Sequence, residues 1–183
     1  MQRNILEYLE KTVQCVPDKI AFSSEEEALT FRQLYDQARA VGTFLNRQGH
    51  YQRPVVVFMQ KQPKTVAAFL GVIYSGCYYV PLDADMPRYR IERIVQELKP
   101  AACICDDTTL ETAAQLSGIG SIYSYSSLGA GGIDERALRS IRQQQIDTDP
   151  IYIVFTSGST GVPKGNAPAL VFGLAEKVTA CVS

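Results

Sequence analysis

The spacing of hydrophobic residues near the amino terminus changes from helical to strand-like and back. Apolar residues at helical spacing extend from Asn4 to Val16, and Pro17 predicts the end of this first helix. Two short apolar segments, 19–22 and 29–31, flank a charged turn and predict a β-hairpin. Hydrophobic residues then recur on one helical face, which predicts a second helix that ends near Gly49.

The middle of the chain repeats a strand-then-helix order. Pro54 to Met59 is a continuous apolar run, as expected for a strand that is covered on both faces, and Lys64 to Tyr74 predicts a helix. The pattern continues with a predicted helix at 88–98, strand at 101–105, helix at 110–116, strand at 121–125 and polar helix at 133–144. This alternation predicts an α/β fold: a mostly parallel sheet with helices on both faces and ligands bound beyond the carboxyl ends of its strands.

The last predicted strand, 152–155, is apolar and is expected to be buried; it leads directly into a loop of glycines, hydroxyl-bearing residues and a lysine. Glycines permit positive φ angles, so consecutive backbone N–H groups can converge on an anion. Hydroxyl groups add donors, and the lysine adds a positive charge. The predicted phosphate-binding residues are Thr156, Ser157, Gly158, Ser159, Thr160, Gly161 and Lys164.

Three other interpretations of this loop fit less well. A P-loop needs Gly-Lys followed by Ser or Thr, whereas Pro163 precedes Lys164 and Gly165 follows it. The segment 158–161 also lacks the Gly-x-Ser-x-Gly spacing of a hydrolase nucleophile elbow. A merely flexible loop would explain neither the apolar strand before it nor its Pro-Lys-Gly ending. We therefore interpret the loop as phosphate-binding.

Residue by residue, 152–165 resembles the phosphate-binding signature of the acyl-adenylate-forming enzymes, the superfamily of acyl-CoA synthetases, luciferases and nonribosomal peptide synthetase adenylation domains. Two earlier segments, 29–34 and 71–83, resemble further motifs of this superfamily in the same order. The second of these, together with 88–91, is typical of its amino-acid-activating branch. The resemblance covers 4–165 and implies the amino-terminal part of an adenylation domain.

The resemblance also implies a reaction. In such enzymes a carboxylate attacks the α-phosphate of ATP to give an acyl-adenylate and pyrophosphate, and the acyl group then passes to a thiol. It implies ATP and Mg²⁺ as cofactors, an amino or other carboxylic acid as substrate and a carrier-protein thiol as partner in the full-length family. The side chains it assigns to the β- and γ-phosphates are those of Thr156, Ser157, Ser159, Thr160 and Lys164. No catalytic residue is assigned, because the sequence places no His or carboxylate to activate a hydroxyl.

Composition excludes several other classes of function. With 183 residues and 46% hydrophobic residues, the chain is expected to form one globular domain. The formal net charge is -1 with the two signs mixed along the sequence, which argues against a nucleic-acid partner. No apolar stretch approaches the roughly 20 residues that span a bilayer, and the first residues do not resemble a signal peptide. We therefore expect no membrane partner and a cytoplasmic location.

Neither a disulfide framework nor a metal site is predicted. The five cysteines are scattered, and Cys103 and Cys105, two apart in an apolar strand, are interpreted as buried structural thiols on one face. Zinc would need more ligands at suitable spacing, and the one histidine, His50, is interpreted as a surface residue in a loop. Asp83 and Asp85 are interpreted as turn residues rather than as cation ligands.

The segment after the loop does not resemble the continuation of the family. We therefore expect two parts, residues 1–165 as the amino-terminal part of an adenylation domain and 166–183 as a non-family tail. This predicts a truncated adenylating ligase that is not fully active alone. The alternative is a stand-alone nucleotide-binding or protein-interaction module without ligase activity.

Overall fold

The computed structural model describes residues 5–146, 148–155 and 169–170. Its helices are α1 (Ile5–Cys15), α2 (Phe31–Arg47), α3 (Pro63–Tyr74), α4 (Arg88–Leu98), α5 (Leu110–Ala114) and α6 (Glu135–Gln144), with a short 3₁₀ helix at Tyr125–Ser127. Its strands are β1 (Ile20–Ser23), β2 (Ala28–Thr30), β3 (Pro54–Phe58), β4 (Tyr78–Leu82), β5 (Ala102–Cys105), β6 (Ser121–Ser124), β7 (Ile153–Val154) and β8 (Ala169–Leu170).

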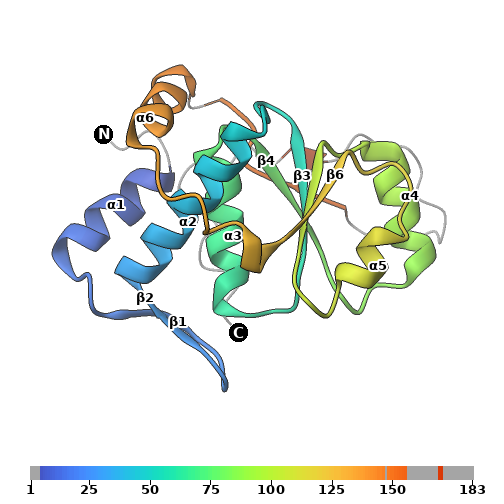
Figure 1. Cartoon of the computed structure of the whole chain (residues 1–183), viewed down its shortest axis with the longest axis horizontal. Helices are drawn as coiled ribbons and strands as arrows, with labels where there is room; N and C mark the ends of the chain where they lie inside the picture. The colour runs from blue at the N-terminus through green and yellow to red at the C-terminus, as the bar shows by residue number, and fades with distance from the viewer. Residues whose placement is uncertain (1–4, 147, 156–168, 171–183) are drawn as a thin grey trace.

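A parallel sheet forms the centre of the described chain (Figure 1). Its strand order is β4-β3-β5-β6, and every pair in it is parallel. The chain therefore moves outward from β3 to β4 and then crosses back to β5 on the other side of β3. All residues of β3 are buried, as the continuous apolar run predicts. The predicted mostly parallel sheet is confirmed.

Helices cover both faces of this sheet, with α2 and α3 on one side and α4 and α5 on the other (Figure 1). Successive side chains of β3 point to opposite faces. Val55 accordingly packs in one apolar cluster with Val72 of α3, and its neighbour Val56 packs in another with Ile91 of α4. The expectation of helices on both faces is also confirmed.

The first family-like segment, 29–34, joins the hairpin of β1 and β2 to α2. The Thr30 hydroxyl accepts from the backbone N–H of Gln33 at 3.2 Å, and the Gln33 side chain accepts from the backbone N–H of Thr30 at 2.9 Å. This capping box satisfies donors that the first turn of a helix leaves free. The sequence pattern predicted Phe31 as the last residue of the strand. The structure instead makes it the first residue of α2.

Helices α2 and α3 approach each other closely where the second family-like segment begins. A β-carbon at Gly71 would lie 2.5 Å from the Val41 side chain and 2.9 Å from the Ala38 carbonyl oxygen. Only a residue without a side chain fits such a crossing. Gly71 therefore fixes how α3 lies against α2, and with it the position of β4, which follows α3.

Strand β7 differs from the prediction. The sequence predicted a buried strand over 152–155, but β7 contains only Ile153 and Val154. Ile153 is buried, whereas Val154 is 39% exposed. Val154 is exposed because β7 lies at the β4 edge of the sheet, where it follows a parallel bridge between Tyr152 and Tyr79. The prediction was wrong in extent and burial.

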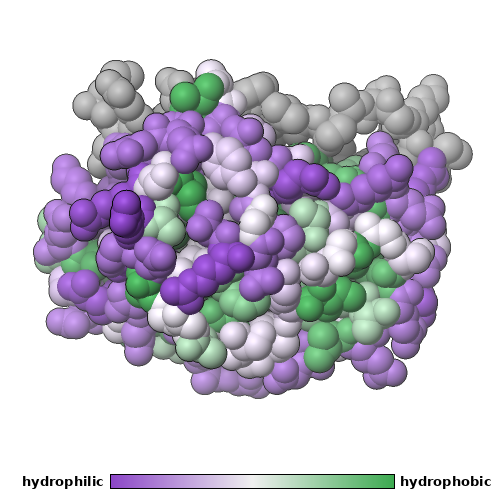
Figure 2. All heavy atoms as spheres, turned by 45° about the horizontal axis from the view of Figure 1, so that its top comes forward, coloured by the Kyte–Doolittle hydropathy of each residue, from purple (hydrophilic) through white to green (hydrophobic). Residues whose placement is uncertain are grey.

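The surface is mixed in character. On the face drawn in Figure 2, hydrophilic side chains predominate and hydrophobic ones form small separate patches. Within the described part of the chain, no helix has both the length and the hydrophobicity that crossing a membrane requires.

Cys103 and Cys105 lie in the core, in one apolar cluster, which confirms that they share a face.

Candidate functional site

The candidate site lies at the carboxyl edge of the sheet. Tyr152 bridges Tyr79 in parallel fashion, so Phe155 lies at the same edge as the carboxyl ends of β3 and β4. From Phe155 the chain continues into the predicted phosphate loop. The residues predicted to bind phosphate, Thr156, Ser157, Gly158, Ser159, Thr160, Gly161 and Lys164, lie outside the described residues. The structure therefore defines the base from which this loop starts.

An aromatic stack fixes the start of β7. The ring of Tyr79 stacks on the ring of Phe69 of α3, with 4.4 Å between their centroids. It also stacks on the ring of Tyr152, with 5.6 Å between their centroids. The backbone N–H of Tyr79 also donates to the Ile151 carbonyl at 3.0 Å. Stacked aromatic rings bury large apolar areas. Elements from the middle of the sequence thus hold the segment that precedes the loop.

Phe155 is held by two different contacts. Its half-buried ring packs against the apolar cluster that contains Val80 and Ile91. Its carbonyl oxygen accepts a hydrogen bond from Arg90 Nη2 of α4 at 3.4 Å. The last described residue before the loop is therefore fastened to α4 through both its side chain and its backbone.

A cavity of about 610 Å³ opens beside this segment. Apolar side chains form much of its lining, and among them are Phe22, Val57, Phe69, Met86, Val154 and Phe155. The hairpin, β3, α3 and β7 each contribute to this wall. An apolar hollow with few polar groups at the carboxyl edge of a parallel sheet is the usual form of a ligand site in α/β proteins.

One ion pair lies at the cavity. Lys61 Nζ lies 2.9 Å from Asp83 Oδ2, and Asp83 Oδ1 accepts from the Asp85 backbone N–H at 3.1 Å. The hydrogen bond from Lys61 holds the pKa of Asp83 below its usual value, and the same bond raises the pKa of Lys61. The interpretation of Asp83 and Asp85 as turn residues is confirmed, since Met86 donates back to the Asp83 carbonyl at 3.0 Å.

The described residues contain no cluster of typical metal-binding side chains. None of their His, Cys, Asp and Glu side chains gather in groups of three or more that could hold a metal. Asp83 already engages Lys61. We therefore assign no metal ligand to this part of the chain and derive no chemical step through a metal.

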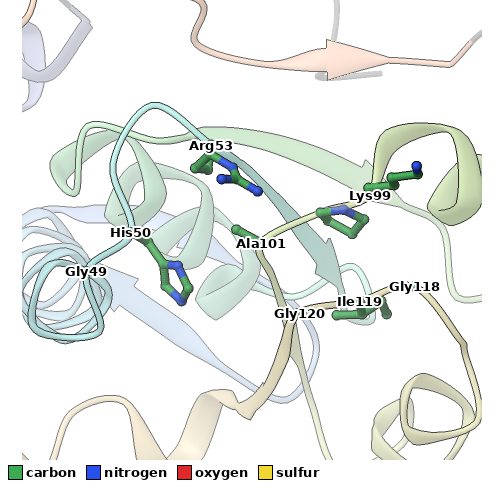
Figure 3. A pocket seen from close by; sticks show the side chains of 9 residues that line it. Gly49, His50, Arg53, Lys99, Ala101, Gly118, Ile119 and Gly120 are labelled. Carbon is green, nitrogen blue, oxygen red and sulfur yellow. The ribbon is translucent and has the colours of Figure 1, made fainter.

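A second hollow, of about 530 Å³, lies at the opposite, amino-terminal edge of the strands (Figure 3). His50, Arg53 and Lys99 line it, but the Lys99 amino group extends away from the other two (Figure 3). His50 is half-buried, and its Nε2 lies 3.2 Å from the Tyr123 hydroxyl. Burial, and then the charge of Arg53, lower the pKa of His50. The interpretation of His50 as a plain surface residue was wrong, because the aromatic ring of a distant strand covers it.

The sequence patterns did not predict the contacts of Arg90 and Lys61. Arg90 lies in 88–91, a segment that the family resemblance includes, but the resemblance gave it no role. Its partner Phe155 is 65 residues away, so no local pattern links the two. Lys61 and Asp83 each follow a parallel strand, and their meeting at one edge was the available signal.

Comparisons with known proteins agree with the residue motifs. The family described as AMP-binding enzyme matches residues 9–168. The D-alanine–D-alanyl carrier protein ligase of Listeria welshimeri is 31% identical over 173 residues, which cover 90% of this chain and 32% of the ligase. Tyrocidine synthase 1 of Brevibacillus parabrevis is 28% identical over 164 residues, or 89% of this chain and 15% of the synthase. The chain spans about a third of the length of the carrier protein ligases that it matches.

Solved structures show the same fold. VinN in complex with 3-methylaspartate has a TM-score of 0.69 at 22% identity, and the match covers 84% of this chain and 44% of VinN. The anthranilate CoA ligase AuaEII in complex with anthranoyl-AMP has a TM-score of 0.69 at 19% identity, covering 88% of this chain and 34% of AuaEII. With a family match over most of its length, the chain belongs to the AMP-binding enzyme family.

Proposed function

We propose that this chain supplies the ATP phosphate-binding part of a ligase that adenylates an amino acid or another carboxylic acid. The observation that carries the proposal is the family match over 9–168, which includes the loop motif at 152–165. Its support from the fold is the position of Phe155 at the carboxyl edge of a parallel sheet, beside an apolar cavity. The proposed phosphate-binding residues are Thr156, Ser157, Gly158, Ser159, Thr160, Gly161 and Lys164.

The proposed chemistry depends on the charge of pyrophosphate. A carboxylate oxygen attacks the α-phosphorus and forms a new P–O bond. The bond from the α-phosphorus to the oxygen that bridges the α- and β-phosphates then breaks, and negative charge grows on the leaving pyrophosphate. Preorganised N–H and hydroxyl donors together with Lys164 would stabilise that charge. The attacking carboxylate is already a nucleophile, so the loop needs no general base. ATP is proposed as its magnesium complex, with the metal ligands left unassigned.

The names of the relatives suggest the class of acid and the acceptor. One relative is a ligase for D-alanine and a D-alanyl carrier protein, and another is a peptide synthase. We therefore propose an amino acid as the preferred acid and a carrier-protein thiol as the acceptor. A cytoplasmic location would give such a reaction its supply of ATP.

We further propose that residues 1–165 form the amino-terminal part of the adenylation domain, that 166–183 is a non-family tail, and that these 183 residues bind ATP without completing turnover alone. The carrier protein ligases, which are about three times as long, support the proposal that the chain corresponds to only part of such an enzyme. The nucleotide sequence beyond the codon for Gly165 distinguishes this proposal from a stand-alone binding module. A family-like continuation in any reading frame supports the ligase, and its absence supports the module.

ATP–pyrophosphate exchange tests the activity directly. The 183-residue chain is assayed with a panel of amino and aryl acids, beside equilibrium titration with ATP. We expect ATP binding but no acid-dependent exchange. Exchange with any acid would show that the chain suffices for adenylation, and it would name the substrate. Failure to bind ATP would contradict the proposed role of the loop.

A further inference from the structure

The hollow at the amino-terminal edge of the strands is lined by basic side chains and by no carboxylate (Figure 3). Its lining comes from the loop before β3, the segment between α4 and β5, and the turn before β6. It includes His50, Arg53 and Lys99 but no Asp or Glu. A hollow of about 530 Å³ lies within the size range of small-molecule sites. The charge of this lining favours an anionic ligand.

Arg53 is the main charged donor of the hollow. Its side chain is exposed, and no carboxylate of the described residues forms a salt bridge with it. The planar fork of a guanidinium group binds pairs of oxygens on a phosphate or a carboxylate. Lys99 lines the same hollow, but its amino group extends away from Arg53, so it adds only its charge (Figure 3).

His50 is the second donor. Its Nε2 lies 3.2 Å from the hydroxyl of Tyr123 in β6, and the centroids of the two rings are 6.1 Å apart. When the hydroxyl donates to Nε2, the ring proton resides on Nδ1, which has no hydrogen-bond partner among the described residues. The charge of Arg53 reaches this ring, because after burial it is the second cause that lowers the pKa of His50. The two donors therefore face one region.

We propose that this hollow binds a small organic phosphate, with the phosphate group held between His50 and Arg53. A phosphate monoester carries close to two negative charges at neutral pH and has three terminal oxygens, so it can engage both side chains at once. A carboxylate has one charge and two oxygens, which the Arg53 fork alone would occupy. Apolar atoms of Pro100, Ala101 and Ile119 line the same hollow and would contact the organic part. The site is separate from the candidate site at the carboxyl edge.

The single histidine of the chain makes a local test possible, since its ring protons give a nuclear magnetic resonance signal from this hollow. The 183-residue chain is titrated with phenyl phosphate and, separately, with benzoate, at an ionic strength held constant with sodium chloride. We expect phenyl phosphate to shift the His50 signal to saturation, with a Kd about tenfold lower than that of benzoate. The pKa of His50 should rise in the bound state, because the anion offsets the charge of Arg53.

Arg53→Gln removes the proposed donor, and Arg32→Gln is its matched control. Arg32 is exposed and lies in the first turn of α2, whereas His50 follows the end of that helix. The 17 residues of α2 rise about 1.5 Å each, which separates the two ends by roughly 25 Å. Arg53→Gln should raise the Kd for phenyl phosphate about tenfold, and Arg32→Gln should leave it unchanged. Both substitutions are at the surface, so the melting temperatures should stay within about 4 °C of the unchanged chain.

Three results would overturn the proposal. The first is a His50 signal that phenyl phosphate shifts no further than sodium chloride does. The second is an affinity for benzoate that equals the affinity for phenyl phosphate. The third is the same Kd for phenyl phosphate in Arg53→Gln and Arg32→Gln. These outcomes are independent of ATP binding, because the His50 signal reports on the amino-terminal edge of the sheet.

Discussion

Asp106 joins two loops at the carboxyl edge of the sheet, and its substitution by Asn tests how that edge is held. The residue follows β5 and is 5% exposed. Its Oδ2 accepts from the Gln60 backbone N–H at 2.7 Å, and its Oδ1 accepts from the Thr109 backbone N–H at 3.0 Å. Thr108 adds donation from its hydroxyl at 2.6 Å. Gln60 follows β3 and immediately precedes Lys61 of the candidate site.

These contacts set how much Asp106→Asn should lower the free energy of unfolding. Asp106→Asn preserves shape but turns one acceptor into an NH₂ donor, which then faces an N–H group. A hydrogen bond to a charged group contributes about 1.5–3 kcal/mol, and an unsatisfied buried donor costs about 1–3 kcal/mol. We therefore expect the free energy of unfolding to fall by about 2–4 kcal/mol. That is a large part of the roughly 5–15 kcal/mol that stabilises a typical domain.

The stabilisation that Asp106 contributes should decrease at low pH. Burial alone would raise the pKa of Asp106, but the hydrogen bonds from Thr108, Gln60 and Thr109 outweigh it, and the pKa lies below its usual value. A carboxyl group with a lowered pKa stabilises the fold above its unfolded pKa of about 3.9 and loses that effect as pH falls through the folded value. The difference between the unchanged chain and Asp106→Asn should therefore shrink as pH falls below about 4.

Urea unfolding across this pH range measures both effects. The matched control is Asp107→Asn, because Asp107 is the exposed neighbour and its substitution removes the same charge. We expect the control to change stability by less than about 0.5 kcal/mol. A similarly small change for Asp106→Asn at neutral pH would show that the Asp106 carboxylate does not stabilise this edge, and so would a large change that does not depend on pH.

Three further predictions concern the fold that carries the site. Thr30→Ala should lower the free energy of unfolding by about 1 kcal/mol, because α2 loses its capping box; an unchanged urea midpoint would contradict this. Gly71→Ala gains about 1 kcal/mol of helix propensity but forces a methyl group against Val41, so the free energy of unfolding should fall by about 2 kcal/mol in total. A more stable variant would disprove the close crossing of α2 and α3. Burial raises the pKa of Cys105 to about 11, so maleimide near neutral pH should label exposed Cys15 before Cys105, as mass spectrometry would detect; equal rates at these two thiols would contradict the burial.

Periodic hydrophobic patterns predicted most of the elements, because each pattern reports which face of a local segment is buried. The run 54–59 and the helical stripe at 64–74 correspond closely to β3 and α3. The order of the strands was not predictable in the same way. Nothing local to β5 specifies that it pairs with β3 rather than with β4, since that choice depends on long-range packing.

The loop motif predicts phosphate binding, but no local pattern predicts the contacts that the described residues make at the carboxyl edge of the sheet. Arg90 and Phe155 meet only because α4 and β7 both lie beside β4, and the ion pair of Lys61 with Asp83 joins two separate loops. His50 was misjudged for the same reason, since its cover comes from Tyr123 on a distant strand. Side chains that act across the fold leave no periodic signal in the sequence.

Lys164 and its loop are proposed to bind the outer phosphates of ATP, and this proposal can be tested by comparing affinities for ATP and AMP. Calorimetric titration of the 183-residue chain, Lys164→Ala and the exposed control Lys11→Ala with ATP and with AMP separates the phosphates from the nucleoside. Loss of a charge-assisted contact should weaken ATP binding about tenfold to a hundredfold in Lys164→Ala. AMP lacks the β- and γ-phosphates, so its affinity should not change. Equal affinity for ATP in the unchanged chain and Lys164→Ala, or an equal loss for ATP and AMP, would show that Lys164 does not bind the outer phosphates.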